Sequence, residues 1–200
     1  MKTWVPFTRK ELLNTIKSCN NTLTPSLDKL SWRHLKKIVR NEECIDKLID
    51  IANVYIDLEH RPSHFKTLST VIIPKPNKVL YDLPKVFCPI VLFNTTDKLF
   101  KKIIEERMQF LLIFNNFIHP CQLGELKHRS TIDIDIILTH FIRSRWVKNL
   151  TMSTLAFNIT QFFPLLNHQL LPLILAKAGF NPKVSNFFKN YLVSRKSKYL

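Results

Sequence analysis

Glycine is nearly missing from this chain: only two of its 200 residues are glycine, whereas average usage in proteins is about 7 %. Glycine adopts positive φ without steric cost and lets two backbone segments approach closely, so folds with sheets and tight turns usually contain more of it. The chain is therefore expected either to be almost entirely helical or to carry other residues at positions that favour glycine.

Cysteine is also sparse. Widely separated thiols without a Cys-x-x-Cys pair are typical of reduced cysteines in the cytoplasm or nucleus, and they argue against a disulfide framework. His60-x-x-x-His64 and His119-x-Cys121 have spacings that a zinc site could use, but neither has further ligands nearby, so we expect no structural zinc. The four cysteines are Cys19, Cys44, Cys88 and Cys121.

Long apolar runs and acidic residues are the other shortages. No apolar run approaches the roughly 18–20 residues that a membrane-spanning helix needs, and residues 1–6 lack the apolar core of a signal peptide. Against 15 Asp and Glu stand 30 Lys and Arg, a net charge of +15, which favours a polyanion such as nucleic acid as partner. A hydrophobic content of 46 % is enough to bury the core of one domain, or of a piece of a larger one.

Hydrophobic spacing and capping residues predict the helices. Thr8 and Glu11 form a capping box, Asn41 is an N-cap, Gly179 occupies a C′ position, and Pro182 follows Asn181 at a first helical position. Helices are expected over residues 8–18, 28–39, 42–58, 97–115, 130–146 and 168–178, and from 182 onward, with a loop over 20–25.

Three segments are predicted to be extended, which makes the expected fold class α+β. Residues 67–78 are β-rich and stop at two prolines, and residues 89–93 complete a hairpin-like element with residues 77–85 at its tip. The apolar residues before Asn158 predict a buried strand over 153–158. The basic residues 194–200 are expected to enter another strand.

The segment Leu155-Ala-Phe-Asn-Ile-Thr-Gln-Phe-Phe-Pro-Leu-Leu-Asn-His168 carries the most specific pattern. It resembles the first palm motif of reverse transcriptases of LINE-type (non-long-terminal-repeat) retrotransposons. In that family the strand ends in a metal-binding aspartate, and the matching residue here is Asn158. The resemblance implies helix-rich fingers, followed by the first strand and helices of a polymerase palm that is incomplete at its C-terminus.

The chemistry of the family requires carboxylates. Two Mg²⁺ ions held by acidic side chains activate the primer hydroxyl and stabilise charge on the transferring phosphate. Asn158 offers a neutral carbonyl oxygen in place of an anionic ligand, and the later aspartate pair of the family is not in this sequence. We therefore expect no polymerisation by this chain, and no cofactor, although the intact family uses Mg²⁺.

Other segments match the family in the same order along the chain. Val71-Ile-Ile-Pro-Lys-Pro-Asn-Lys78 resembles the fingers motif whose lysine reaches the incoming triphosphate, which implies that role for Lys75. Phe87-Cys-Pro-Ile resembles a motif that reads Phe-Arg-Pro-Ile, so Cys88 stands where an arginine clamps phosphate. Residues 122–131 resemble a segment that lies against template and palm. Phe163 matches the residue that excludes a ribose 2′-hydroxyl.

Each match has a plainer interpretation when it is taken alone. A Pro-Lys-Pro-Asn-Lys run is commonly a solvated turn, and paired phenylalanines are commonly core. Only the order and spacing of the matches, over most of the chain, support the family. The resemblance implies a helical region over 1–66, fingers over 67–150 and the start of a palm over 151–200.

The departures from the family also offer an explanation for the glycine shortage. Ser26, Asp97 and Glu125 stand where relatives tend to have glycine, Cys88 replaces an arginine, and Asn158 replaces an aspartate. Because these changes fall on catalytic, ligand-binding and backbone positions alike, the chain is interpreted as a decayed, inactive fragment of a retrotransposon polymerase.

Three functions follow from this interpretation. The first is a reverse-transcriptase-like fragment without activity; the second is a basic nucleic-acid-binding protein from the same source; the third is a helical interaction module. The expected partner is RNA or an RNA–DNA duplex, with no membrane partner, in the nucleus or cytoplasm. The basic residues expected to contact nucleic acid are Lys78, Lys127, Arg129, Arg195, Lys196 and Lys198.

Overall fold

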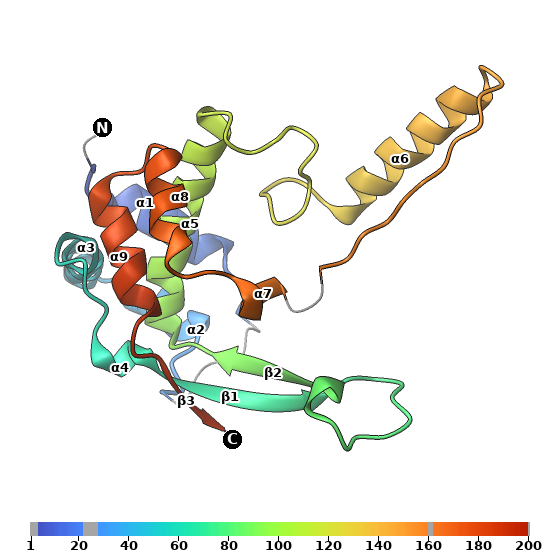
Figure 1. Ribbon diagram of the computed structural model, residues 1–200. Helices are drawn as coiled ribbons and strands as arrows, with labels where there is room; N and C mark the ends of the chain where they lie inside the picture. The colour runs from blue at the N-terminus through green and yellow to red at the C-terminus, as the bar shows by residue number, and fades with distance from the viewer. Residues whose placement is uncertain (1–3, 22–27, 160–161, 200) are drawn as a thin grey trace. The chain divides into compact units, whose positions relative to one another are not determined.

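The computed structural model describes residues 4–21, 28–159 and 162–199, with the backbone alone for Phe163 and Pro164. The fold is α+β, with helices and one small mixed sheet (Figure 1). The helices are α1 (Arg9–Ser18), α2 (Trp32–Ile38), α3 (Glu42–Asp57), α4 (Ser63–Lys66), α5 (Thr95–Phe114), α6 (Thr131–Trp146), α7 (Phe162–Leu165), α8 (Leu170–Lys177) and α9 (Pro182–Leu192), and Pro84–Val86 form a 3-10 turn, η1. The strands are β1 (Thr67–Pro74), β2 (Phe87–Leu92) and β3 (Lys196–Tyr199).

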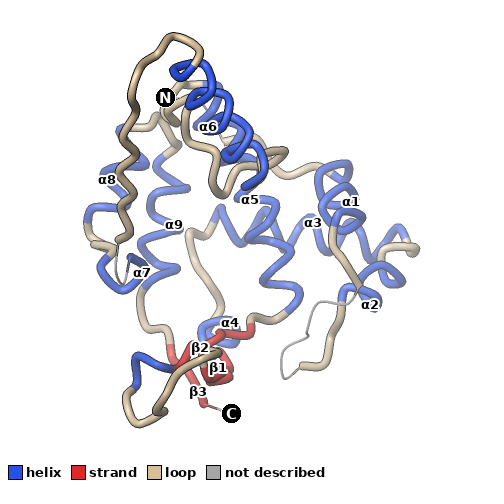
Figure 2. Tube along the Cα trace, turned by 90° about the vertical axis from the view of Figure 1, so that its right-hand side faces the viewer, coloured by secondary structure: helices blue, strands red, loops and turns tan. Residues whose placement is uncertain are grey.

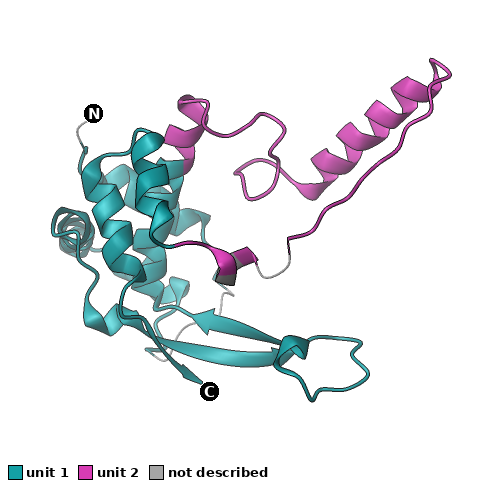
Figure 3. Ribbon diagram, in the orientation of Figure 1, with its two compact units in different colours: residues 1–108, 168–200 teal, residues 109–167 magenta. Residues whose placement is uncertain are grey.

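The chain forms two compact units, residues 1–108 with 168–200 (unit 1) and residues 109–167 (unit 2) (Figure 3). Unit 1 holds the sheet and most of the helices, whereas unit 2 holds the end of α5, together with α6 and α7. The domain limits expected from the resemblance, at residues 66 and 150, stay a prediction.

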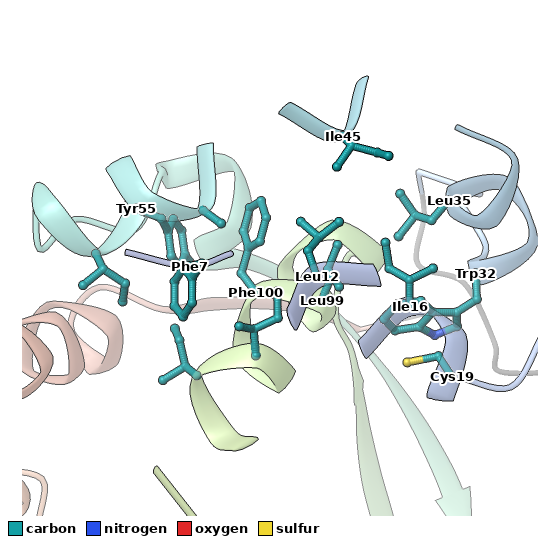
Figure 4. Packing of buried hydrophobic residues seen from close by; sticks show 14 of the residues in the cluster. Phe7, Leu12, Ile16, Cys19, Trp32, Leu35, Ile45, Tyr55, Leu99 and Phe100 are labelled. Carbon is teal, nitrogen blue, oxygen red and sulfur yellow. The ribbon is translucent and has the colours of Figure 1, made fainter. Parts of the chain in front are cut away.

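The core of unit 1 lies between α1, α2, α3, α5 and α9 (Figure 4). The Tyr55 ring lies 5.4 Å from that of Phe100 and 5.1 Å from that of Phe187, measured between ring centroids. Leu12 and Leu99 are completely buried in the same cluster. Because Phe187 comes from α9, the C-terminal part of the chain completes a core that N-terminal helices begin.

The sheet has the strand order β2-β1-β3. β1 and β2 form an antiparallel hairpin, while β3 runs parallel to β1 along its other edge. Both views place the sheet at one end of unit 1, beyond the ends of α5 and α9 (Figure 2). The predicted hairpin and the predicted C-terminal strand are therefore confirmed.

Local capping signals were reliable. Thr8 and Glu11 form the capping box of α1, the Asn41 side chain accepts the backbone N–H of Cys44 at the start of α3, and Asn181 caps α9 with Pro182 at its first position. Two helices begin two or more residues later than predicted: α2 starts at residue 32 rather than 28, after Ser31, and α8 at residue 170 rather than 168. The loop predicted over 20–25 lies mostly outside the described residues.

The strand predicted over residues 153–158 is wrong. Residues 151–159 belong to no helix or strand. A strand exists only where a neighbouring strand bonds to its backbone, and the described sheet consists of β1, β2 and β3 without this segment. The apolar run therefore has no strand partner among the described residues.

Replacement of glycine is visible in the backbone. Glu125 has φ 58°, the left-handed region that favours glycine, whereas Asp97 lies within α5 and needs no such conformation. Ser26 is outside the described residues. Among the described residues, the non-glycine residues with positive φ are Lys29, Glu59, Asn77, Asn116, Glu125, His128, Asn149 and Ser194. Because non-glycine residues are strained in this region, the shortage of glycine leaves backbone strain at several turns.

Gly179 and Glu59 offer a matched test of that strain. Gly179 has φ 84° and ends α8 with the N–H of Phe180 bonded to the carbonyl of Leu175 at 3.1 Å, while Glu59 ends α3 with φ 51°. Gly179→Ala should lower the free energy of unfolding by about 1 kcal/mol, and Glu59→Gly should raise it by about 0.5–1 kcal/mol. Urea denaturation measures both, and shifts of the same sign would contradict the assignment.

Candidate nucleic-acid interface

The hairpin brings Lys75 and Cys88 to one face of the sheet. Ile73 pairs with Cys88, and directly paired residues project to the same face, as do residues two apart along a strand. The N–H of Lys75 donates to the carbonyl of Val86 at 2.9 Å, which extends the ladder past the end of β1. Lys75 therefore lies on the same face as Cys88, one step toward the tip.

β3 adds two lysines to that face. Lys196 pairs with Thr67, and Lys198 pairs with Ser69; Ser69 is an even number of residues from Ile73, so the same alternation applies. All three lysines and Cys88 are exposed. We call the set Lys75, Cys88, Lys196 and Lys198 the basic sheet face.

The loop between β1 and β2 holds Lys75 through two hydrogen bonds. Its ammonium donates to the carbonyl of Lys85 at 2.9 Å, and its own carbonyl accepts the hydroxyl of Tyr81 at 2.8 Å. The Tyr81 ring packs on Phe87 at 5.9 Å between centroids. Two further N–H groups of the Lys75 ammonium remain to bind a ligand. Lys78, at the exposed tip, belongs to the same hairpin.

Arg195 lies apart from this face. Its guanidinium sits 5.3 Å from the Tyr191 ring centroid and 5.5 Å from that of Phe93. Stacking of this kind fixes the guanidinium plane while leaving its N–H groups for hydrogen bonds. Arg195 is thus a positioned cation beside β3.

Beneath Arg195 lies a buried ionic cluster that the sequence did not predict. Asp97 and Arg61 are both completely buried, with Arg61 Nη2 at 2.8 Å from Asp97 Oδ2. Lys101 Nζ contacts the same oxygen at 2.8 Å, and the hydroxyl of Tyr55 donates to Oδ1 at 2.9 Å. One carboxylate therefore holds two cations and a phenol inside unit 1.

Burial sets the proton affinities in this cluster. It lowers the pKa of Lys101 to about 7, although the attraction of Asp97 acts in the opposite direction. Burial and the negative charge of Asp97 raise the pKa of Tyr55, and burial raises that of Tyr191. These directions follow from the cost of placing a charge in a low-dielectric interior.

The remaining predicted site residues belong to unit 2. Asn158 is exposed within the irregular segment 151–159. Arg129 Nη1 donates to the carbonyls of Pro120 and Gln122, both at 2.9 Å, so it holds its own loop together. Lys127 is exposed in that loop. Phe163 lies in α7, and its side chain is outside the described part.

The described residues contain no group of three or more His, Cys, Asp or Glu that could hold a metal ion. Among these residues, no helix is both long and apolar enough to cross a membrane. The His64 Nε2 lies 3.1 Å from Asn94 Nδ2, and His119 Nδ1 accepts the N–H of Cys121 at 3.2 Å. These histidines serve local hydrogen bonds.

Comparison with known proteins identified no relative of this chain. No family model matches the chain, and no curated protein matches it.

Proposed function

We propose that the chain is a reverse-transcriptase-like fragment that binds RNA or an RNA–DNA duplex and does not polymerise. The observation that carries the proposal is the basic sheet face, because it gathers Lys75, Cys88 and the β3 lysines on one surface. In the resembled fingers, a lysine and an arginine at the positions of Lys75 and Cys88 contact phosphate. A shared face for these two positions supports the resemblance.

The absence of polymerisation is proposed on the donor chemistry. An amide oxygen at Asn158 supplies no negative charge, and hard cations such as Mg²⁺ prefer anionic oxygen ligands. Cys88 cannot make the bidentate phosphate contact that an arginine makes. The lysines can still attract the phosphate backbone of a nucleic acid, and this attraction needs neither a metal nor a specific base sequence.

A triple variant tests the binding surface. Lys75→Gln/Lys78→Gln/Lys198→Gln should weaken binding to a single-stranded RNA and should reduce the slope of log K against log salt by about 2, because each lost phosphate contact contributes about 0.7 for single strands. Fluorescence anisotropy over a salt series measures both quantities. The matched control is Lys10→Gln/Lys17→Gln/Lys37→Gln, which removes the same charge from exposed positions on α1 and α2.

Equal effects of the two triple variants would mean that net charge alone attracts RNA, and would remove the basic sheet face from the proposal. A primer-extension assay with Mg²⁺ completes the test, with no product expected. Extension of the primer would contradict the proposed inactivity.

A helical interaction module is the second candidate, and α6 favours it. None of its residues is buried, yet it exposes large apolar side chains around its circumference. These side chains are Ile132, Ile134, Ile136, Ile137, Leu138, Phe141 and Trp146. RNA binding that is weak and insensitive to salt would favour this candidate over the first.

A further inference from the structure

A cavity of about 290 Å³, open to solvent on one side, lies in unit 1 beside the first residues of β1 and β3. Its walls come from residues 60–67, which include α4 and the first residue of β1, and from residues 194–196 at the start of β3. The pairing of Thr67 with Lys196 joins these two stretches, which are far apart in the sequence. Pairing of β1 with β3 therefore creates the cavity.

Every side chain that lines the cavity can donate a hydrogen bond, and none is a carboxylate. The nitrogen donors are His60, Arg61, Lys66 and Lys196, and the hydroxyl donors are Ser63, Thr67 and Ser194. Lys66 and Lys196 form no ion pair with a carboxylate of the described residues. Such a lining attracts an anion rich in acceptor oxygens and repels a cation.

Arg61 belongs to this lining, and neighbouring side chains hold it in place. Its side chain is fully buried, and two of its nitrogens, Nε and Nη2, are held by Asp97 at 3.4 and 2.8 Å. Its guanidinium carbon lies 4.6 Å from the Tyr191 ring centroid. The third nitrogen, Nη1, is buried and finds no hydrogen-bond partner in the described part of the chain. An unpaired buried donor costs free energy, which a bound acceptor would recover.

Positive charge around the cavity exceeds what Asp97 neutralises. That carboxylate is shared by Arg61 and Lys101, and the guanidinium of Arg195 lies above the same rings, Phe93 and Tyr191, that Lys101 contacts. With Lys66 and Lys196 at the cavity itself, the surrounding charge is strongly positive. A buried arginine held by Asp97, flanked by lysines and hydroxyls, suits a tetrahedral oxyanion.

We propose that this cavity binds a phosphate group, either inorganic phosphate or the backbone phosphate of a nucleic acid. Arg61 fixes the inner end of the site, Lys66 and Lys196 close on the anion from either side, and the hydroxyls of Ser63 and Ser194 donate to its oxygens. The site shares Lys196 with the basic sheet face but includes neither Lys75 nor Cys88, and it stands whether or not the chain derives from a polymerase.

The test is a titration of the full chain with inorganic phosphate, in which broadening of the ³¹P line measures binding. Chloride keeps the ionic strength constant. Lys66→Gln/Lys196→Gln should weaken phosphate binding at least tenfold. The control Lys10→Gln/Lys17→Gln removes the same charge from exposed positions of α1, outside both the cavity and the basic sheet face, and should change phosphate binding less than twofold. Arg61 is left intact because its loss would disturb the fold.

Competition with a single-stranded RNA separates the two sources of phosphate. If inorganic phosphate displaces the RNA and the cavity variant weakens both, the site takes a backbone phosphate. If phosphate binds, but neither added phosphate nor the cavity variant changes the affinity for RNA, the site takes free phosphate. Absence of saturable phosphate binding, or equal weakening by the two double variants, overturns the proposal. If the chain binds inorganic phosphate but no RNA, the proposed function is rejected and the phosphate site remains.

Discussion

Asp97→Ala is expected to lower the free energy of unfolding by about 3–5 kcal/mol, because it leaves buried cations without their counter-charge. Arg61 is completely buried and Lys101 is largely buried, and both contact Asp97 at 2.8 Å. The hydroxyl of Tyr55 would lose its acceptor as well. A loss of this size is a large fraction of the roughly 5–15 kcal/mol that stabilises a typical domain.

Guanidinium denaturation of the variant measures this loss. The control is Asp57→Ala, since Asp57 forms a pair with Lys183 at 2.6 Å in which both side chains are about half exposed, at 49 and 45 %. Removal of an exposed pair should cost less than about 1 kcal/mol. Equal losses for the two variants would mean that the Asp97 cluster is solvated in solution.

Apolar replacement of the pair gives a second measurement. Arg61→Met/Asp97→Leu should be less destabilised than the sum of its single variants, because no unpaired charge remains at that pair and hydrophobic isosteres often substitute for buried ion pairs. Additive single effects would show that the two side chains do not interact.

Raising the pH from about 7 to about 10 is expected to stabilise unit 1 by on the order of a few kcal/mol. Burial lowers the pKa of Lys101 to about 7 in the fold, whereas the lysine of an unfolded chain has a pKa near 10.4. Below pH 7 both states carry the proton. Between these values only the unfolded chain binds it, so stability rises with pH.

Above about pH 10 the trend should reverse. The pKa of Tyr55 is raised in the fold by burial and by Asp97, so the unfolded chain loses that proton first and stability falls. Thermal unfolding between pH 6 and pH 11 measures the profile. Lys101→Met should flatten its rising limb, while Lys189→Met, at an exposed position of α9, should leave it unchanged. A wild-type profile that is flat from pH 7 to 10 would contradict the lowered pKa.

Helix ends and the hairpin could be predicted because their causes are local. The capping side chains Thr8 and Asn41 bond to backbone groups three residues away, and Gly179 is the residue that a left-handed helix end favours. The prolines at 74 and 76 stop a β-rich run. Interactions of this range are visible in any short window of sequence.

The ionic cluster could not be predicted, because no local pattern marks it. Arg61 precedes a proline and looks like an ordinary turn residue, and Asp97 sits in the first turn of a helix, where an acid is favoured by the helix dipole. Their contact joins residues 36 apart. The resemblance implies a glycine at the position of Asp97, yet its carboxylate bonds to Arg61 and Tyr55, which explains an acid at this position.

The strand predicted over 153–158 failed for the opposite reason. Apolar composition measures preference for an extended backbone, but pairing decides whether a strand forms. Residues 151–159 have no partner among the described strands. The β3 strand, although short and polar, is formed because β1 offers it a free edge.

The pairing of β3 with β1 also constrains the order in which the protein can fold. Thr70 and Ser197, whose hydroxyls bond across these strands, are 127 residues apart, and α9 supplies Phe187 to the core of the N-terminal helices. During synthesis the first hundred residues leave the ribosome with an apolar surface that α9 later covers. Closing so long a loop is slow, so we expect the nascent chain to expose that surface until α9 has been synthesised, and to be open to aggregation or chaperone binding during that interval.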